Sequence, residues 1–280
     1  MLDVPVRRLK VEDDLTDCLN LAQDRSWARE ENKWRLLFAI GDVYGIDDPE
    51  HGGLAGTVVS TPYGRDVSAI SMVLVAKRHE RRGMGGRLMR HVMENSGTAS
   101  ACLTATDYGR VLYERLGFRT VGQCTAYTGE LSELPEPRVE SPRVEPVDMP
   151  AILALDTEVF GAPRTELYQH FPDFAEVFRA VRDSGPGGLA GFGGAWHNGD
   201  QLIIGPVIAR DATTALGLVE SLARTTGQVR LDVDHRHPEL REWAVERGLE
   251  PLFSTAVMEY GEPISGDPSR MFVPVMQALG

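Results

Sequence analysis

Cysteine is scarce in this chain, and so are long apolar runs and positive charge. The three cysteines among 280 residues, Cys18, Cys102 and Cys124, are odd in number and unclustered, which argues against a disulfide framework and against a zinc site. The sequence places no histidine beside any of them, as a thiol nucleophile would need. Cys102, within ACLTA, is most simply a small residue of a buried strand.

Signals for export and for membrane insertion are also absent from the sequence. The start, MLDVPVRRLKVEDD, lacks the basic stretch followed by an apolar run that marks a signal peptide, and no apolar stretch is long enough to span a bilayer. The formal net charge of −12 argues against general binding to nucleic acid or to anionic membranes. We therefore expect a cytoplasmic monomer or homodimer without nucleic-acid or membrane partners, in which an anionic ligand needs a local basic site.

The chain repeats one pattern on either side of a segment rich in proline and glutamate, residues 131–146, which reads as a linker or an extended crossing. LVAKRHERRGMGGRLMRHVM has a later counterpart in VIARDATTALGLVESLA, and YERLGFRTV is echoed by AVERGLEPL, with Gly117 and Gly248 in corresponding places. The length also suits two domains better than one. We predict two related domains, residues 1–135 and 136–280, of α/β class with a mixed α+β sheet.

Within the first half, hydrophobic periodicity predicts the order of the elements. A helix is expected to begin near Asp13, and residues 54–76 read as two strands around a turn at 62–66. The next expected elements are a helix from 84 to about 95, a strand at 100–105, a short helix ending at Gly117, and one or two strands over 118–129. In the second half, Asp148 is expected to cap a helix that has Pro150 in its first turn.

A glycine-rich turn joins the second of these strands to the next helix, in LVAKRHERRGMGGRLMRH. Glycines allow backbone N–H groups to approach an anion, the new helix adds the positive end of its dipole, and arginines add direct phosphate contacts. The residues concerned are Arg81, Arg82, Gly83, Gly85 and Gly86. The turn is neither a P-loop nor a dinucleotide fingerprint, because Arg87 and Leu88 stand where those motifs need Lys followed by Ser or Thr, or a last glycine.

Together with LYERLGF at residues 112–118, this strand, turn and helix resemble the GNAT superfamily of acyl-CoA-dependent N-acyltransferases. The signature of that family is an apolar strand, Q/R-x-x-G-x-G/A, a helix, and a downstream L-Y-x-x-x-G-F motif. The resemblance covers most of residues 1–130 and implies two tandem GNAT-like domains. Two positions depart from it: Glu80 stands where the family has Gln or Arg, and Thr106 where an asparagine is frequent.

The resemblance implies that acetyl-CoA binds as a co-substrate, with its diphosphate on the turn and its arm paired with the preceding strand like an added strand. The residues that would bind it are Val73, Leu74, Val75, Arg81, Arg82, Gly83, Met84, Gly85 and Gly86. Tyr113 matches the tyrosine of the LY motif and would donate a proton to the leaving thiolate; alternatively, it only packs its ring on the sheet. No metal is expected.

The remaining polar and aromatic candidates leave alternatives open. No general base stands out, since Glu80, Asp66 and Asp107 are only loop candidates and a base acting through water serves equally well. The aromatic rings of Trp27 and Trp34 would either flank the acceptor or pack the first helices onto the sheet. The polar run LDVDHRHPE would either hold a metal or simply be solvated at a strand end; its candidates are Asp232, Asp234, His235 and His237.

The second half lacks the features that would hold acyl-CoA. Asp211 stands near the position of the glycine turn, where it would repel a diphosphate and cap the helix instead, and Ala244 stands where Tyr113 is in the first half. The C-terminal domain therefore reads as degenerate, with a structural or substrate-site role. The prediction is an N-acetyltransferase that transfers the acetyl group of acetyl-CoA to a primary amine of a small molecule by direct attack on the thioester. The alternatives are a non-catalytic acyl-CoA sensor or interaction module, transfer of a longer acyl chain, and a protein amine as acceptor.

Overall fold

The structure, a computed structural model, describes residues 4–132, 134–183, 188–224 and 227–280. Residue 133, within the predicted linker, lies outside them. The first half alternates helices and strands in the expected order. Its elements are β1 (Arg7–Arg8), α1 (Val11–Asp24), α2 (Glu31–Ile40), β2 (Asp42–Asp47), β3 (Leu54–Tyr63), β4 (Val67–Val75), η1 (Lys77–His79), α3 (Met84–Asn95), β5 (Ser100–Ala105), α4 (Asp107–Arg115) and β6 (Arg119–Glu130).

The second half repeats this order from α1 to β6 and then adds a short C-terminal strand. Its elements are η2 (Pro146–Asp148), α5 (Met149–Phe160), α6 (Thr165–Phe174), β7 (Val177–Arg182), β8 (Leu189–Asn198), β9 (Gln201–Ala209), α7 (Ala212–Leu222), β10 (Gln228–Asp234), α8 (Pro238–Glu246), β11 (Glu250–Gly261), η3 (Pro268–Arg270) and β12 (Met271–Val273). The predicted repeat is thus present element by element.

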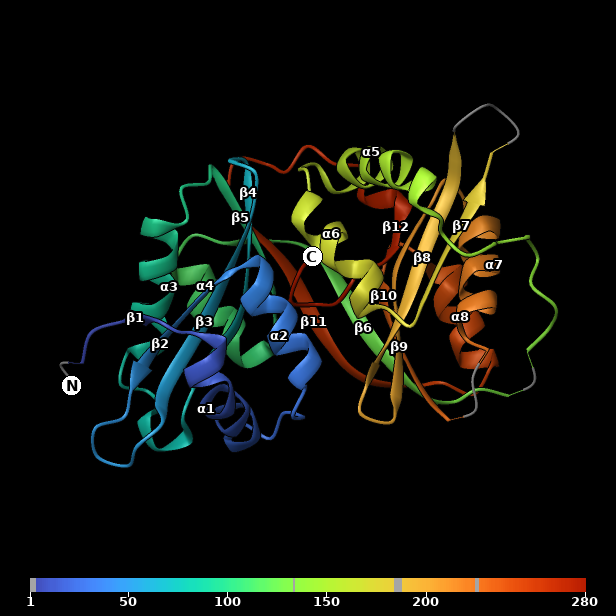
Figure 1. The fold of residues 1–280 in the computed structure, drawn as a ribbon. Coiled ribbons are helices and arrows are strands. Elements are labelled where there is room, and N and C mark those ends of the chain that lie inside the picture. The colour runs from blue at the N-terminus through green and yellow to red at the C-terminus, as the bar shows by residue number, and fades with distance from the viewer. Residues whose placement is uncertain (1–3, 133, 184–187, 225–226) are drawn as a thin grey trace.

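The described strands form one mixed sheet of 12 strands, in the order β1-β2-β3-β4-β5-β11-β6-β10-β9-β8-β7, with β12 paired to β9. The two halves exchange their last strands: β11 pairs with β5 of the first half, and β6 pairs with β10 of the second. The exchanged strands β6 and β11 also pair with each other and cross the centre of the molecule in Figure 1. Each half therefore completes its sheet with a strand from the other.

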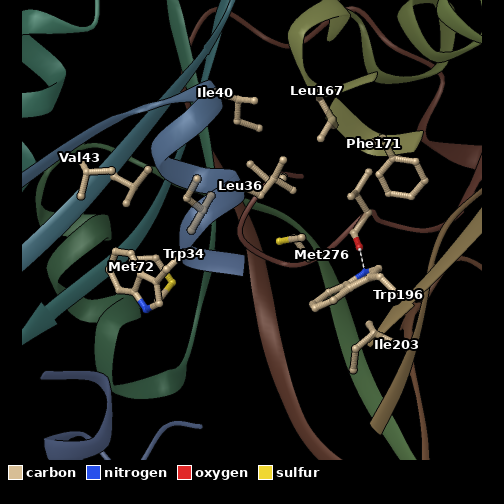
Figure 2. Close-up of a cluster of buried hydrophobic side chains, with 14 of the residues drawn as sticks. Trp34, Leu36, Ile40, Val43, Met72, Leu167, Phe171, Trp196, Ile203 and Met276 are labelled. Carbon is tan, nitrogen blue, oxygen red and sulfur yellow. Dashed lines mark hydrogen bonds between the residues drawn. The ribbon is translucent and has the colours of Figure 1, made fainter. Parts of the chain in front are cut away.

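Helices cover both faces of this sheet. Helices α1 and α2 lie on one face together with α5 and α6, and α3, α4, α7 and α8 cover the other (Figure 1). On the first face, α2 and α6 meet and share a hydrophobic core, into which Leu36, Ile40, Leu167 and Phe171 point (Figure 2). The halves are packed as one unit, because this core draws on both. None of the helices in the described ranges is both long and apolar enough to cross a bilayer.

Most of the sequence-based boundaries agree with the structure, and two details differ. Helix α1 begins at Val11, two residues before the expected start at Asp13. Asp148 holds the N-cap position of α5, but its side chain does not cap that helix. Its carboxylate instead accepts a hydrogen bond from the backbone N–H of Glu145 at 2.9 Å and pairs with Arg182 at 2.8 Å. Glu145 precedes α5 and Arg182 lies on β7, so these two partners draw the Asp148 carboxylate away from the first turn of the helix.

Candidate functional site

The glycine-rich turn forms an open helix start. Gly83 is the N-cap residue of α3 and has a φ of 78°, a left-handed conformation that favours glycine. A β-carbon on Gly83 would meet nothing within 4 Å. Helix α3 receives no side-chain cap at this end, so the N–H groups of its first turn are available to an anion, beside the exposed Arg81 and Arg82. A diphosphate fits this combination.

The other two glycines of the turn, Gly85 and Gly86, allow α3 to pack closely against α4, in addition to keeping the turn free of side chains. A β-carbon on Gly85 would lie 3.3 Å from Leu112, and one on Gly86 would lie 3.6 Å from the same side chain. Met84, between the turn and the helix, is buried. The predicted diphosphate residues are thus brought together, with Gly83 facing open space and Gly85 and Gly86 facing α4.

A buried carboxylate anchors the chain just before the turn. Asp48 accepts hydrogen bonds from Nε of Arg78 at 2.6 Å and from Nε2 of His79 at 2.8 Å. Although burial opposes the charged form, these bonds from His79 and Arg78 hold the pKa of Asp48 well below its usual range. Asp48, His51 and His79 are also the group among the described residues whose atoms lie close enough to hold a metal ion, but Arg78 already occupies the same carboxylate oxygen.

Strand β4 has an irregularity at the point where the arm of acetyl-CoA is predicted to run. Met72 has a φ of 48°, and the register between β3 and β4 shifts between the pairs Thr57–Leu74 and Val59–Ser71. The pairing of β4 with β5 covers only residues 67–69 with 100–102. Beyond this point the β5-facing edge of β4 has no strand partner in the described chain. Val73, Leu74 and Val75 follow the bulge, where an extended arm could pair with them.

Tyr113 lies in α4, on the same side of the sheet as α3. Its side chain is 8% exposed and packs in the cluster that contains Leu88, with the Phe118 ring 6.1 Å away between centroids. Burial raises the pKa of Tyr113 to about 12, so the phenol keeps its proton at physiological pH. This position of Tyr113 is compatible with a proton donor, and it is equally compatible with a tyrosine that only packs its ring on the sheet.

In the second half, the equivalent helix start is closed. Asp211, the N-cap residue of α7, accepts a hydrogen bond from the backbone N–H of Thr214 at 2.8 Å. This hydrogen bond is the main reason that the pKa of Asp211 is lowered. A carboxylate already occupies the positive end of α7, as the sequence predicts. Ala244 is the seventh residue of α8, as Tyr113 is of α4.

The equivalent arm groove is filled by the chain itself. The register between β8 and β9 also shifts, and Val207 and Ile208 follow that shift as Leu74 and Val75 follow the one in β4. These two residues pair with β12, Ile208 with Met271 and Val207 with Val273. The chain then runs so close to β9 that a β-carbon on Gly205 would lie 2.2 Å from the carbonyl oxygen of Pro274. Strand β12 thus takes the backbone positions that an arm would need.

A cavity of about 580 Å³ opens where the two halves meet. Its wall in the first half comes from the loop before α2, from β4 at residues 70–72, and from the end of β5. The second half contributes residues of β8 to β11 and the C-terminal residues 276–278. The cavity borders the bulge of β4, so it lies beside the strand on which the arm of acetyl-CoA is predicted to run. Its size is that of a small-molecule site.

Two charged residues of the first half line this cavity and were not singled out from the sequence. Glu30 and Lys33 form an ion pair, and the side chain of each is 10% exposed. Glu30 also accepts a hydrogen bond at 2.9 Å from Asn198, which comes from β8 of the second half. In SWAREENKW these residues look like an ordinary solvated helix start, but in the structure a residue of the second half lies against them.

The two tryptophans named from the sequence have different surroundings. Trp27 is 42% exposed and lines the cavity, whereas Trp34 is fully buried in the core.

Glu80 pairs with Arg25. None of the three carboxylates proposed as a base, Glu80, Asp66 and Asp107, is among the described residues that line the cavity. Thr106 instead caps α4, accepting a hydrogen bond from the N–H of Gly109 at 3.4 Å.

The polar run at the end of β10 has protein partners throughout. Asp232 pairs with Arg230, and Asp234 pairs with Arg236. His235 contacts the hydroxyl of Thr125 at 2.7 Å, and His237 contacts the carbonyl oxygen of Met271 at 3.0 Å. The two histidines therefore face different neighbours. Ligands of one metal would converge on a common point, and these two side chains do not.

Comparison with known proteins agrees with this geometry. Residues 40–120 match a family model described as an acetyltransferase (GNAT) domain, and residues 152–273 match a second model with the same description. Over the full length of both chains, the sequence is 24% identical to the uncharacterized N-acetyltransferase YitH of Bacillus subtilis.

Solved structures show the same fold along the chain. A provisionally assigned acetyltransferase from Pyrococcus horikoshii superposes with a TM-score of 0.81 at 18% identity, covering 100% of this chain and 97% of its own. A tandem GNAT protein from the clavulanic acid biosynthesis pathway gives a TM-score of 0.64 at 14% identity, covering 93% of this chain and 99% of its own. The chain therefore belongs to the GNAT acetyltransferases and carries two GNAT domains in tandem.

Proposed function

We propose that the first half transfers an acetyl group from acetyl-CoA to a primary amine of a small molecule bound in the cavity between the halves. The observation that carries this proposal is the asymmetry of the two grooves. In the first half the helix start and the edge of β4 are open, and in the second half Asp211 and β12 close both. A single donor site per chain, in the first half, follows from this asymmetry.

In this proposal, the chain binds and orients both substrates and moves two protons. The N–H groups at the start of α3, with Arg81 and Arg82, hold the diphosphate, and the backbone of β4 after Met72 holds the arm. A strand N–H beside the bulge stabilises the oxyanion that forms when the amine attacks the thioester carbonyl. No covalent bond between the enzyme and the acetyl group is needed.

The bond changes balance with one acid and one base. The C–N bond forms, the C–S bond breaks, and Tyr113 gives its phenolic proton to the leaving sulfur. The proton that the amine loses is taken by the pair of Glu30 and Lys33, the ionisable groups of the first half that line the cavity. Burial, and then the positive charge of Arg230, lower the pKa of Lys33, so its ammonium group gives up a proton within this ion pair more readily than an exposed lysine would.

The test is an assay of thiol release from acetyl-CoA with a panel of small amines, together with calorimetry of CoA binding. We expect binding at one site per chain and release of thiol that depends on the amine. Binding without any turnover would favour the sensor function instead. No binding, or two equivalent sites per chain, would contradict the proposed function.

A further inference from the structure

The cavity between the halves is lined by both apolar and charged groups, and their arrangement bears on which amine it accepts. Rings and aliphatic chains form much of the wall, including Trp27, Trp196, Ile203, Leu252, Phe253 and Met276. A small molecule that fills this space must therefore carry an apolar body. A purely polar acceptor such as a sugar amine would leave these side chains against its hydroxyl groups.

The charges of the cavity balance. Its charged lining residues are two acids, Glu30 and Asp232, and two bases, Lys33 and Arg230. A polyamine or another polycation would be favoured by a cavity with an excess of carboxylates, which the described lining does not have. An acceptor with one positive and one negative group matches a wall whose charges are two ion pairs, Glu30 with Lys33 and Asp232 with Arg230.

The negative group of such an acceptor has a suitable partner in Arg230. Asp232 accepts hydrogen bonds from Nε and Nη2 of Arg230 at 2.8 and 3.0 Å, and the guanidinium carbon lies 5.1 Å from the centre of the Phe253 ring. Within the described part of the chain, Nη1 of Arg230 makes no hydrogen bond. Asp232 and Phe253 thus fix the plane of the guanidinium and leave one edge for a ligand carboxylate.

The positive group has its partner on the opposite half. Glu30 lies at the start of α2, held between Lys33 and Asn198, and is the carboxylate of the first half in the cavity wall. The hydroxyl of Ser71, next to the bulge of β4, is buried and has no hydrogen-bond partner among the described residues, although it lines the same cavity. An amine that enters between Glu30 and β4 would satisfy both groups.

We propose that the acceptor is an amino carboxylate with an apolar side chain, that is, an amino acid or a close analogue, with its amine between Glu30 and β4 and its carboxylate on Arg230. This inference rests on the proposed function, because it assigns the acceptor of the same site. It also makes Arg230, a residue of the degenerate half, a determinant of specificity for the reaction in the first half.

Matched pairs of acceptors test the inference. Phenylalanine, tryptophan, leucine and methionine are compared with their decarboxylated amines, and spermidine serves as a polycation, in the thiol-release assay. We expect kcat/KM for the best amino acid to exceed that of its decarboxylated amine by about tenfold or more, since a hydrogen-bonded ion pair is lost with the carboxylate. Equal or better use of the amines or of spermidine would overturn the inference while leaving the transferase intact.

Variants of Arg230 test whether this residue causes the preference for an amino acid over its decarboxylated amine. Arg230→Gln is expected to lower kcat/KM for the amino acid to that of its amine, mainly through KM; a change in the pKa of Lys33 would act on both substrates alike, so the ratio of the two kcat/KM values is the readout. Arg241→Gln, at an exposed position of α8, is the control and should change neither. Because Arg230→Gln leaves the buried Asp232 unpaired, Arg230→Lys and a thermal melt of each variant separate loss of folding from loss of recognition.

Binding gives a readout that does not depend on turnover. Calorimetry of the preferred amino acid against the CoA complex should show affinity that falls about tenfold in Arg230→Gln. An amino acid preference that survives Arg230→Gln, or a folded protein that binds no member of any pair, would overturn the inference. Absence of acetyl-CoA binding in the wild type would instead contradict the proposed function.

Discussion

The proposed role of the glycine turn in binding the diphosphate of acetyl-CoA can be tested by one substitution with a matched control. Gly83 and Gly97 lie at the two ends of α3, with φ angles of 78° and 67°, and a β-carbon on either would meet nothing within 4 Å. Gly83→Leu and Gly97→Leu therefore impose the same left-handed backbone on a side chain, at a cost of about 1–2 kcal/mol each. For a chain of this size, each should lower the melting temperature by about 2–8 °C.

Only Gly83→Leu should affect the binding of acetyl-CoA. The space in front of Gly83 is where the diphosphate is proposed to lie, and a leucine side chain there would prevent its approach to the first N–H groups of α3. Loss of two charge-assisted hydrogen bonds at about 1.5–3 kcal/mol each weakens binding by more than about 100-fold. Gly97 lies at the far end of the helix, so Gly97→Leu should bind as the wild type does.

Calorimetry with CoA measures the affinity, and thermal melting measures the stability of the same samples. The reasoning would be refuted by equal melting temperatures and equal affinities for Gly83→Leu and the wild type. It would also be refuted if Gly97→Leu lost binding as fully as Gly83→Leu, since backbone strain alone would then explain the effect.

Three further predictions concern single residues. Tyr113→Phe should lower kcat by about 100-fold or more with little change in the KM for acetyl-CoA, because a general acid is lost and the fold is kept; an unchanged kcat would remove Tyr113 from the mechanism. Asp211→Ala should cost about 0.5–2 kcal/mol of unfolding free energy with unaltered activity. Because the folded-state pKa of Asp211 is lowered, chiefly by its bond to the Thr214 N–H, this cost should be complete above the unfolded pKa and vanish as the pH falls through the folded one, which urea melts at several pH values would measure. Arg164→Met should cost about 3–5 kcal/mol, since it leaves the buried Asp156 unpaired, and urea denaturation should show that adding Asp156→Leu recovers most of the loss.

The local elements near the donor site were predictable because their signals are local. Helix α3 begins at Met84 and ends at Asn95, where the sequence places it, since Gly83 supplies the left-handed start and the apolar residues that follow keep a helical period. The N-cap role of Asp211 follows in the same way from a carboxylate placed before a helical pattern. Neither feature depends on the distant part of the chain.

The acceptor side was not predictable because its residues become a site only through the other half. Trp27 and Trp34 are seven residues apart, yet Trp27 precedes α2 and faces the cavity, whereas Trp34 lies within the helix and faces the core. Glu30 looks solvated in the sequence, but in the structure a residue of β8 lies against it. Residues 276–278 lie in a C-terminal segment rich in apolar residues, and they form part of the cavity wall.

The exchange of β6 and β11 makes the second half necessary to the fold even though its helix start and its groove are closed. The first-half strand β5 is followed in the sheet by β11, so the first half cannot complete its own sheet without the end of the second. The second half also forms one wall of the cavity between the halves. Strand β12 pairs with β9 in the groove of the second half, and those backbone pairs need no ligand. From there the chain reaches the first half, where the carbonyl oxygen of Gln277 accepts a hydrogen bond at 2.9 Å from Thr104 on β5. The segment that fills the groove of the second half thus also lines the cavity proposed here as the acceptor site of the first.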